Sequence, residues 1–215
     1  MAQHARQIVS DVPVQLKTVH VVVSGFGQDR GDPTGCDKLW RRLYSEFASA
    51  ETLVLFCEWD QDMDAVARMI WRHSGSNGES PLVTLAAYSW GLPTAIKLSK
   101  QLWRRGIQTE VLTSCDGVYR RLWRLWAVWF RHPVVSIPPC IRRVEPFRQK
   151  VDWPFGHQLV AEDDQRTVIS ATRWADRGHF TMDELPGFQA RSYAAAVRVQ
   201  WRAGLIDTEP MPPEQ

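Results

Sequence analysis

Apolar runs and amphipathic segments alternate regularly between residues 17 and 116. The apolar runs predict buried strands, and segments whose apolar residues recur every three or four positions predict helices. Because the connections between them are only a few residues long, this order predicts a mostly parallel sheet with helices on both faces. Strands are expected at 17–27, 51–59, 81–88 and 108–116, and helices at 36–50, 62–73 and 92–106.

The pattern changes after Gly117, and the remainder completes one predicted domain. The chain has 215 residues, 44% of them hydrophobic, which suits a single domain with a sizeable core. The predicted fold class is α/β, a three-layer α/β/α sandwich around a mostly parallel sheet. Its expected parts are a domain at 1–206 with an insertion at about 117–140, strand-like segments at 141–149 and 166–174, a closing helix at 183–204 and a flexible tail at 207–215.

The composition narrows the class of function. With 26 basic and 24 acidic residues the formal net charge is +2, so the basic footprint of a nucleic-acid binder is missing. The four cysteines are widely spaced and are expected to be free, buried thiols. The start of the chain lacks the apolar core of a signal peptide, and no run is long enough for a membrane span. A soluble, cytoplasmic protein is expected, with no metal and no cofactor.

Ser89 stands where the third apolar run ends and a helical pattern begins, in the stretch "AAYSWG". A serine on such a turn, with small residues two positions away on either side, has the G-x-S-x-G form of a nucleophile elbow. Here Ala87 replaces the first glycine and Gly91 supplies the second. The alternative is that Ser89 is only the N-cap of the helix. The buried strand before it and the helix after it favour the elbow.

A nucleophilic serine needs a base, and the chain has six histidines. His179 follows the last strand-like segment and precedes the closing helix, so it is expected at the same rim as Ser89. His157 lies before that segment and is expected at the opposite edge of the sheet. His179 is therefore the predicted base, with His157 as the alternative.

An acid should orient the base and offset its charge in the transition state. Asp116 comes directly after the fourth strand, at another carboxyl end, although an acid there could also be a plain turn residue. Asp152 and Asp176 compete with it on position. The chain order serine, aspartate, histidine is the order found in α/β-hydrolases.

These segments together resemble the α/β-hydrolase superfamily, in its lipase and esterase branch, over roughly residues 18–200. "VHVVVSGFG" resembles the family's oxyanion loop, "AAYSWG" its elbow, "LTSCDGVYR" its acid-bearing strand and "RGHFTMDEL" its histidine loop. The resemblance implies a triad of Ser89, Asp116 and His179 in a small, cutinase-sized version of the fold. Asp116 follows the strand directly after that of the nucleophile, as in some lipases, which leaves Asp152 open as a substitute.

An oxyanion hole is also implied by the resemblance. Its donors would be the amide of Trp90 and an amide of Phe26 or Gly27 in the first turn. A plain glycine turn is the alternative for this segment. A phosphate-binding loop is not favoured, because the G-x-x-x-x-G-K-[ST] pattern is absent.

The insertion contains the stretch "RRLWRLWAVWFR", residues 120–131, which predicts a strongly amphipathic helix. Arginines fall on one side, while Trp123, Trp126 and Trp129 lie on the other. Because it follows Asp116, this helix is expected to be a Trp/Arg-rich lid over the rim of the site. Its apolar face would meet acyl chains or a lipid surface, or it would pack on the core and leave arginine in water.

The predicted function is that of a serine esterase or lipase acting on a small-molecule or lipid carboxylic ester with an apolar acyl part. A thioesterase or an acyltransferase would use the same residues, so both remain alternatives. A binding or scaffold protein that kept the fold without its chemistry, and works through the 120–131 helix, is a third. Peripheral membrane contact is possible, and no nucleic-acid partner is expected.

Overall fold

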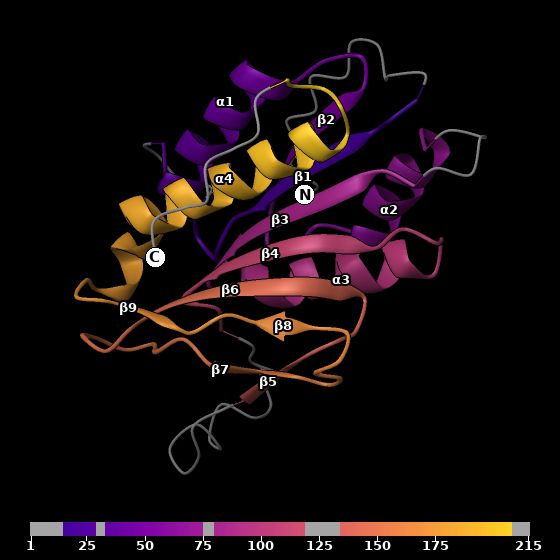
Figure 1. The fold of residues 1–215 in the computed structure, drawn as a ribbon. Helices are drawn as coiled ribbons and strands as arrows, with labels where there is room; N and C mark the ends of the chain where they lie inside the picture. Colours follow the sequence, from indigo (N-terminus) through magenta and orange to yellow (C-terminus); the bar gives the residue numbers. More distant parts are fainter. Residues whose placement is uncertain (1–14, 29–32, 75–79, 119–133, 208–215) are drawn as a thin grey trace.

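A computed structural model describes residues 15–28, 33–74, 80–118 and 134–207. Within them a seven-stranded sheet has the order β2-β1-β3-β4-β6-β8, with β9 also paired to β6, and every pairing is parallel (Figure 1). The predicted fold class is thereby confirmed. The strands are β1 (Thr18–Val23), β2 (Thr52–Cys57), β3 (Leu82–Tyr88), β4 (Thr109–Cys115), β6 (Ile141–Gln149), β8 (Val168–Ile169) and β9 (Arg173–Ala175).

Helices cover both faces of this sheet (Figure 1), with α2 and α3 on one face and α1 and α4 on the other. Strand β1 shows how the sequence produces this arrangement, because successive side chains of a strand point to opposite faces. Val21 and Val23 pack in the core beneath α2 and α3, whereas Val22 packs beneath α1 and α4. A strand buried on both sides is therefore mostly apolar, although Thr18 and His20 of β1 are buried as well. The helices are α1 (Gly35–Phe47), α2 (Met63–Arg72), α3 (Gly91–Trp103) and α4 (Pro186–Arg202).

The single strand expected at 166–174 is two short strands in the structure. β8 pairs with β6 before Pro146, and β9 pairs with β6 after it. Proline has no amide hydrogen, so the ladder of β6 lacks one donor at this position. The interruption between β8 and β9 lies opposite that gap.

Part of the expected insertion is a strand. β5 (Val134–Ile137) pairs in parallel with β7 (Gln158–Ala161), and the two form a separate two-stranded sheet. Residues along β5 alternate between exposed and buried, which is the pattern of a half-buried strand. Neither strand was predicted from the sequence.

The four cysteines are all described, free and buried, as expected. Burial raises the pKa of each thiol, to about 12 for Cys57 and about 11 for Cys140, and well above the usual value for Cys36 and Cys115. A thiol with a raised pKa forms little thiolate and is a poor nucleophile. The cysteines therefore belong to the core.

The carboxyl ends of the central strands share one edge of the sheet, which lies on the left in Figure 1, where β9 leads into the short 3-10 helix η2 (His179–Glu184). In open parallel sheets, ligands bind at this edge. Among the described residues, no helix combines the length and the apolar composition that a bilayer crossing requires.

Candidate active site

Ser89 sits on a strained turn directly after β3. Its φ is +51°, a backbone region that residues with a side chain rarely adopt. The turn packs tightly, since a Cβ built on Gly91 would lie 2.6 Å from the carbonyl oxygen of Ser24. A glycine at this position allows α3 to start against the end of β1. Ala87, in the place of the other elbow glycine, is buried in the core without needing that freedom.

The side chain of Ser89 does not cap α3. The N-cap of that helix is Trp90, and no side chain caps it. Instead, Ser89 Oγ lies 2.8 Å from Nε2 of His179, 90 residues further along the chain. The plain alternative for this serine, an N-cap, is therefore wrong.

His179 is the first residue of η2 and is only 3% exposed. Its Nδ1 lies 2.5 Å from Oδ2 of Asp116. A carboxylate can only accept, so Nδ1 carries the hydrogen, and Nε2 is left to accept from the hydroxyl of Ser89. This is the tautomer that a general base acting on Ser89 requires.

Asp116 is fully buried and, like Ser89, has a positive φ, +46°. Its Oδ1 accepts from the amides of Gly156 (2.9 Å) and Gln149 (3.3 Å). Its Oδ2 accepts from the side-chain amide of Gln149 (3.1 Å) as well as from His179. Four donors thus compensate for the loss of water around this buried carboxylate.

Asp152, the alternative acid, contacts the same histidine at a different atom. Its Oδ1 accepts from the backbone amide of His179 at 2.6 Å. The backbone carbonyl of His179 in turn accepts from the hydroxyl of Tyr88 at 2.6 Å. The geometry therefore joins Asp116 to the ring, while Asp152 and Tyr88 fix the backbone that carries the ring. Asp176, the third candidate, is exposed.

His157 was expected at the opposite edge of the sheet, and this expectation is wrong. Its backbone amide donates to the carbonyl of Gly117 at 2.8 Å, beside Asp116. The loop of 150–157 folds back over the end of β4, because Gly156 and Gln149 both bind Asp116. Sequence position alone did not reveal this return of the chain. The hydrogen-bond partner of Ser89 is nevertheless His179.

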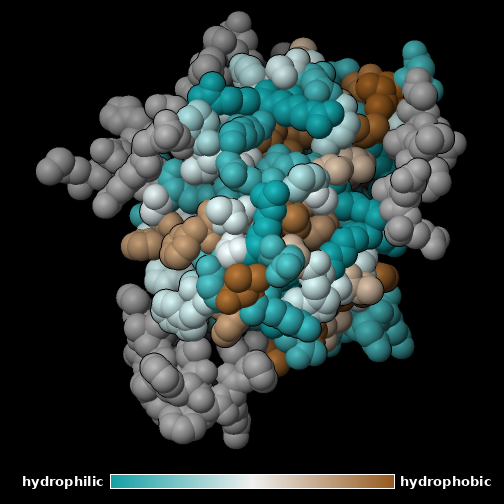
Figure 2. Space-filling view, turned by 90° about the vertical axis from the view of Figure 1, so that its left-hand side faces the viewer, coloured by the Kyte–Doolittle hydropathy of each residue, from teal (hydrophilic) through white to brown (hydrophobic). Residues whose placement is uncertain are grey.

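The first turn, Ser24–Gln28, lies beside the elbow. Phe26 and Gly27 are exposed, and Gly27 has a φ of +77°, which glycine adopts without strain. The ring centroid of Phe26 is 5.3 Å from that of Trp90, so the two residues predicted to supply oxyanion amides are neighbours. Figure 2 views the molecule from this side and shows apolar and polar residues interspersed over the face.

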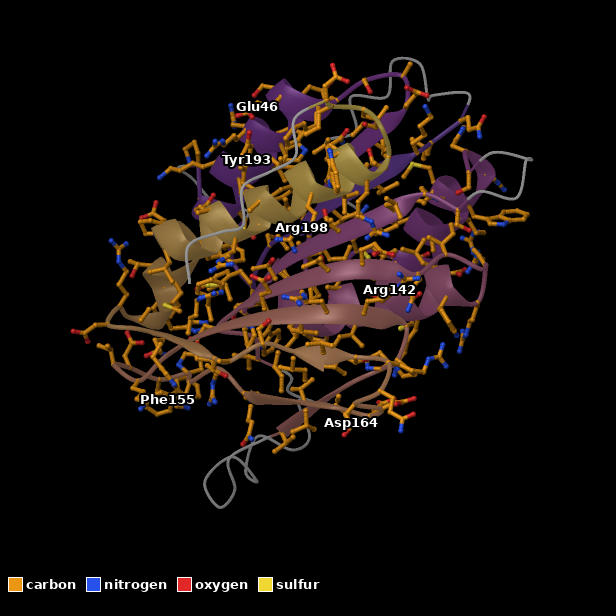
Figure 3. All side chains as sticks on the ribbon, viewed as in Figure 1. Glu46, Arg142, Phe155, Asp164, Tyr193 and Arg198 are labelled. Carbon is orange, nitrogen blue, oxygen red and sulfur yellow. The ribbon has the colours of Figure 1, made fainter. Side chains whose placement is uncertain are left out.

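Aromatic rings surround this edge. Phe26, Trp59 and Trp90 follow β1, β2 and β3 in turn and form a cluster with ring centroids 5.2–5.3 Å apart. Further exposed rings are next to residues that form hydrogen bonds with His179 or Asp116. Figure 3 shows one of them, Phe155, at the left end of the sheet, whereas Arg142 lies at the opposite end of β6. The exposed rings adjoining such residues are Trp153, Phe155 and Phe180.

The predicted lid residues Trp123, Trp126 and Trp129 lie outside the described residues, as does the whole 120–131 segment.

Several supporting residues were missed from the sequence. Gln149 and Gly156 hold Asp116, and Gln28 holds the first turn through the amide of Gly25 (2.9 Å). A single polar residue belongs to no periodic pattern or motif, so its role cannot be predicted from the sequence. The position of Gln28, directly after "SGFG", was the only available signal.

The chain has no match among protein-family models or among the curated proteins. Among solved structures, YbtT, a type II thioesterase from the yersiniabactin NRPS/PKS biosynthetic pathway, aligns over 91% of this chain and 97% of its own, with 12% identity and a TM-score of 0.41. A mutant of the same protein aligns over 91% and 99%, with 11% identity and the same TM-score. Alignments with so low a TM-score do not indicate the activity of this chain. The fold is assigned from the strand order and from the turn at Ser89.

Proposed function

We propose that this chain, an α/β-hydrolase by its fold, is a serine hydrolase that cleaves an acyl ester through an acyl-enzyme on Ser89. One relay of hydrogen bonds supports the proposal above all: Ser89 Oγ to His179 Nε2 at 2.8 Å, and His179 Nδ1 to Asp116 Oδ2 at 2.5 Å. A serine with a purely structural role needs neither this tautomer nor a buried carboxylate behind it.

In the proposed reaction, His179 takes the hydroxyl proton while Ser89 Oγ attacks the carbonyl carbon. The oxyanion that forms is held by the amides of Trp90 and of Phe26 or Gly27, since fixed backbone donors need not reorient as the charge develops. His179 then gives the proton to the leaving atom, and the acyl group stays on Ser89. Water, activated by His179, releases the acid and restores the serine.

The leaving group is the open part of the proposal. The same triad serves oxygen esters, thioesters and acyl transfer, so it does not identify the leaving group. The resemblance of the motifs to lipases and esterases places an oxygen ester first, with a thioester or acyl transfer second. Both solved structures are of a type II thioesterase, which is in keeping with a thioester substrate. Their TM-score of 0.41 does not decide between an ester and a thioester. The proposed activity therefore covers hydrolysis of a carboxylic ester or thioester.

The aromatic rings around Ser89 support an apolar acyl part. Phe26 is 65% exposed although its ring is large, and it contacts Trp59 and Trp90 on the β2 side of the elbow. An aliphatic chain lying against these rings would bury apolar area that is now in water. The lid helix of 120–131 and a lipid-surface contact belong to the same proposal.

The test is a matched pair of substrates: a p-nitrophenyl ester and an N-acetylcysteamine thioester of the same acyl group, over a series of chain lengths. The proposal predicts turnover of at least one member, with a rapid burst of the first product when deacylation is slow. The ratio of kcat/KM within each pair identifies the leaving group.

A non-catalytic binding protein with this fold predicts a different result. Neither series would then be hydrolysed, and no acyl adduct would appear by intact-protein mass spectrometry. That outcome would overturn the proposed function.

A further inference from the structure

One side chain joins the turn proposed to bind the oxyanion to the helix that carries the base. The amide of Gly25 donates to Oε1 of Gln28 at 2.9 Å. Nε2 of Gln28 donates to Oδ2 of Asp183 at 2.6 Å, and Asp183 lies four residues after His179 in η2. The two halves of the site, 155 residues apart at this contact, therefore meet through Gln28.

We call the contacts from Gly25 through Gln28 to Asp183 the bridge. Asp183 is a rigid partner in it because its side chain is only 2% exposed and has other hydrogen-bond partners. Its Oδ2 also accepts from the amide of Cys36 at 3.3 Å, in the first turn of α1. Burial raises the pKa of this carboxyl, while the hydrogen bonds from Gln28 and from the backbone of Cys36 act to lower it. A buried carboxylate that loses a donor is costly, so the contact with Gln28 is favoured strongly.

The bridge also limits which amides of the turn are available. The amide of Gly25 is engaged by Gln28, and the amide of Gln28 approaches the carbonyl of Gly25 at 3.5 Å. Gly27, with a φ of +77°, occupies the third position of this four-residue turn, where a type II turn needs a left-handed residue. The amides of Phe26 and Gly27 are the two donors of the turn that these contacts leave uncommitted.

We propose that Gln28 and Asp183 are positioning residues that hold the first turn at the distance from Ser89 at which its amide meets the substrate oxygen. The inference rests on the proposed function, since it concerns the oxyanion hole of that reaction. It assigns to two residues outside the triad a direct effect on transition-state binding. An oxyanion donor displaced by even a small distance loses much of its effect.

A fluorophosphonate probe tests this without knowledge of the natural substrate. Ser89 Oγ bonds to phosphorus, fluoride leaves, the hydroxyl proton passes to His179, and the phosphonyl oxygen occupies the oxyanion site. The rate of labelling at Ser89 therefore reports that site directly. Rates and melting temperatures would be measured for the full-length wild type, Gln28→Ala, Gln28→Glu, Gln28→Glu with Asp183→Asn, and Gln189→Ala.

Gln189→Ala is the matched control. Nε2 of Gln189 donates to the carbonyls of Asp183 (2.6 Å) and Gly35 (2.9 Å), so it supports the same corner of the fold without touching the first turn. Its removal should lower the melting temperature and leave the labelling rate near that of the wild type. This separates a positioning effect from a loss of stability.

The expected result is a fall in labelling rate of about 10-fold to 100-fold for Gln28→Ala and Gln28→Glu. Gln28→Glu keeps the acceptor for Gly25 but sets two carboxylates against each other. Adding Asp183→Asn lets residue 183 donate to the carboxylate introduced at position 28 and should restore part of the rate, because the contact re-forms with reversed polarity. Recovery should be incomplete, since the amide of Cys36 donates to the same oxygen that the new NH2 group would replace.

Wild-type rates in both Gln28 variants, or no recovery in the double variant, would overturn the positioning role while the labelling of Ser89 still supported the hydrolase. A wild-type protein that takes no label at Ser89 would remove the proposed function, and the positioning role with it.

Discussion

Asp152 accepts a hydrogen bond from the backbone amide of His179 at 2.6 Å. The ring of the same histidine binds a different acid, Asp116, through Nδ1 at 2.5 Å. One aspartate thus holds the backbone that carries the ring, and the other holds the ring itself. Only the second contact sets which nitrogen bears the proton, so the two acids should differ in their effect on catalysis.

Asp116→Asn is expected to lower kcat by about three to four orders of magnitude, because its amide allows the wrong tautomer of His179. Asp152→Asn should cost far less, since its remaining oxygen can still accept from the backbone amide. The measurement is kcat for both variants on one activated ester. The opposite ranking would move the acid to Asp152.

Gly156→Ala should impair the site through Asp116. A Cβ at Gly156 would lie 2.3 Å from Oδ1 of Asp116 and 2.9 Å from its Cα, so the carboxylate must move. We expect kcat to fall by about 100-fold or more, together with stability. Gly106→Ala is the control: its φ is +81° but its Cβ meets nothing within 4 Å, so it should cost stability alone. Equal activity in the two variants would contradict the proposed support of Asp116.

Most of the central sheet could be predicted because β1, β3 and β4 are buried almost throughout and are rich in apolar residues. The small pair β5 and β7 was missed because four-residue, half-exposed strands leave little pattern. The break between β8 and β9 was missed because its cause, Pro146, lies on the neighbouring strand. The sequence of 166–175 itself contains no sign of a proline on the neighbouring strand.

The residues of the candidate triad could be named from motif and chain order, since each follows an element that ends at the same edge. The supporting contacts could not. Gln28 and Asp183 meet across 155 residues, and Gly156 returns to Asp116 across 40. Their pairing depends on loop paths that composition and periodicity do not encode, which is also why His157 was misplaced.

His20 should make the protein less stable at acid pH. It lies fully buried in β1, with Nδ1 2.7 Å from Thr84 Oγ1 and Nε2 2.8 Å from the side-chain amide of Gln200. Burial lowers its pKa from 6.5 to about 3. Below pH 6.5, His20 binds a proton in the unfolded chain but stays neutral in the folded chain. The stability that the protein has with His20 neutral is therefore fully present above pH 6.5 and is lost progressively towards pH 3.

In this pH range the free energy of unfolding should fall by up to about 1.4 kcal/mol per pH unit because of His20. His20→Gln lacks the titrating ring, so its free energy of unfolding should fall less steeply than that of the wild type. Urea unfolding between about pH 7.5 and about pH 4.5 measures the difference. Parallel curves for the two proteins would show that His20 does not titrate as proposed.

The double change Trp126→Ser with Trp129→Ser tests the predicted lid. If these rings meet the acyl chain, kcat/KM should fall progressively as the acyl chain lengthens, while short soluble esters are hydrolysed almost normally. If a lipid surface is involved, vesicle binding by the Ser89→Ala protein should weaken with salt and with the double change. A large fall in melting temperature, uniform losses across chain lengths and no vesicle binding would place the tryptophans in the core.

The turnover of the Ser89→Ala protein tests whether Ser89 is the nucleophile. The hydroxyl of Ser89 lies 2.8 Å from His179 and is the atom proposed to attack the substrate, so its removal leaves nothing to form the acyl-enzyme. Turnover of the best ester or thioester should fall by about four orders of magnitude or more. The melting temperature should stay close to that of the wild type, because only one oxygen is lost. If a folded Ser89→Ala protein hydrolyses the same substrate at the wild-type rate, Ser89 is not the nucleophile.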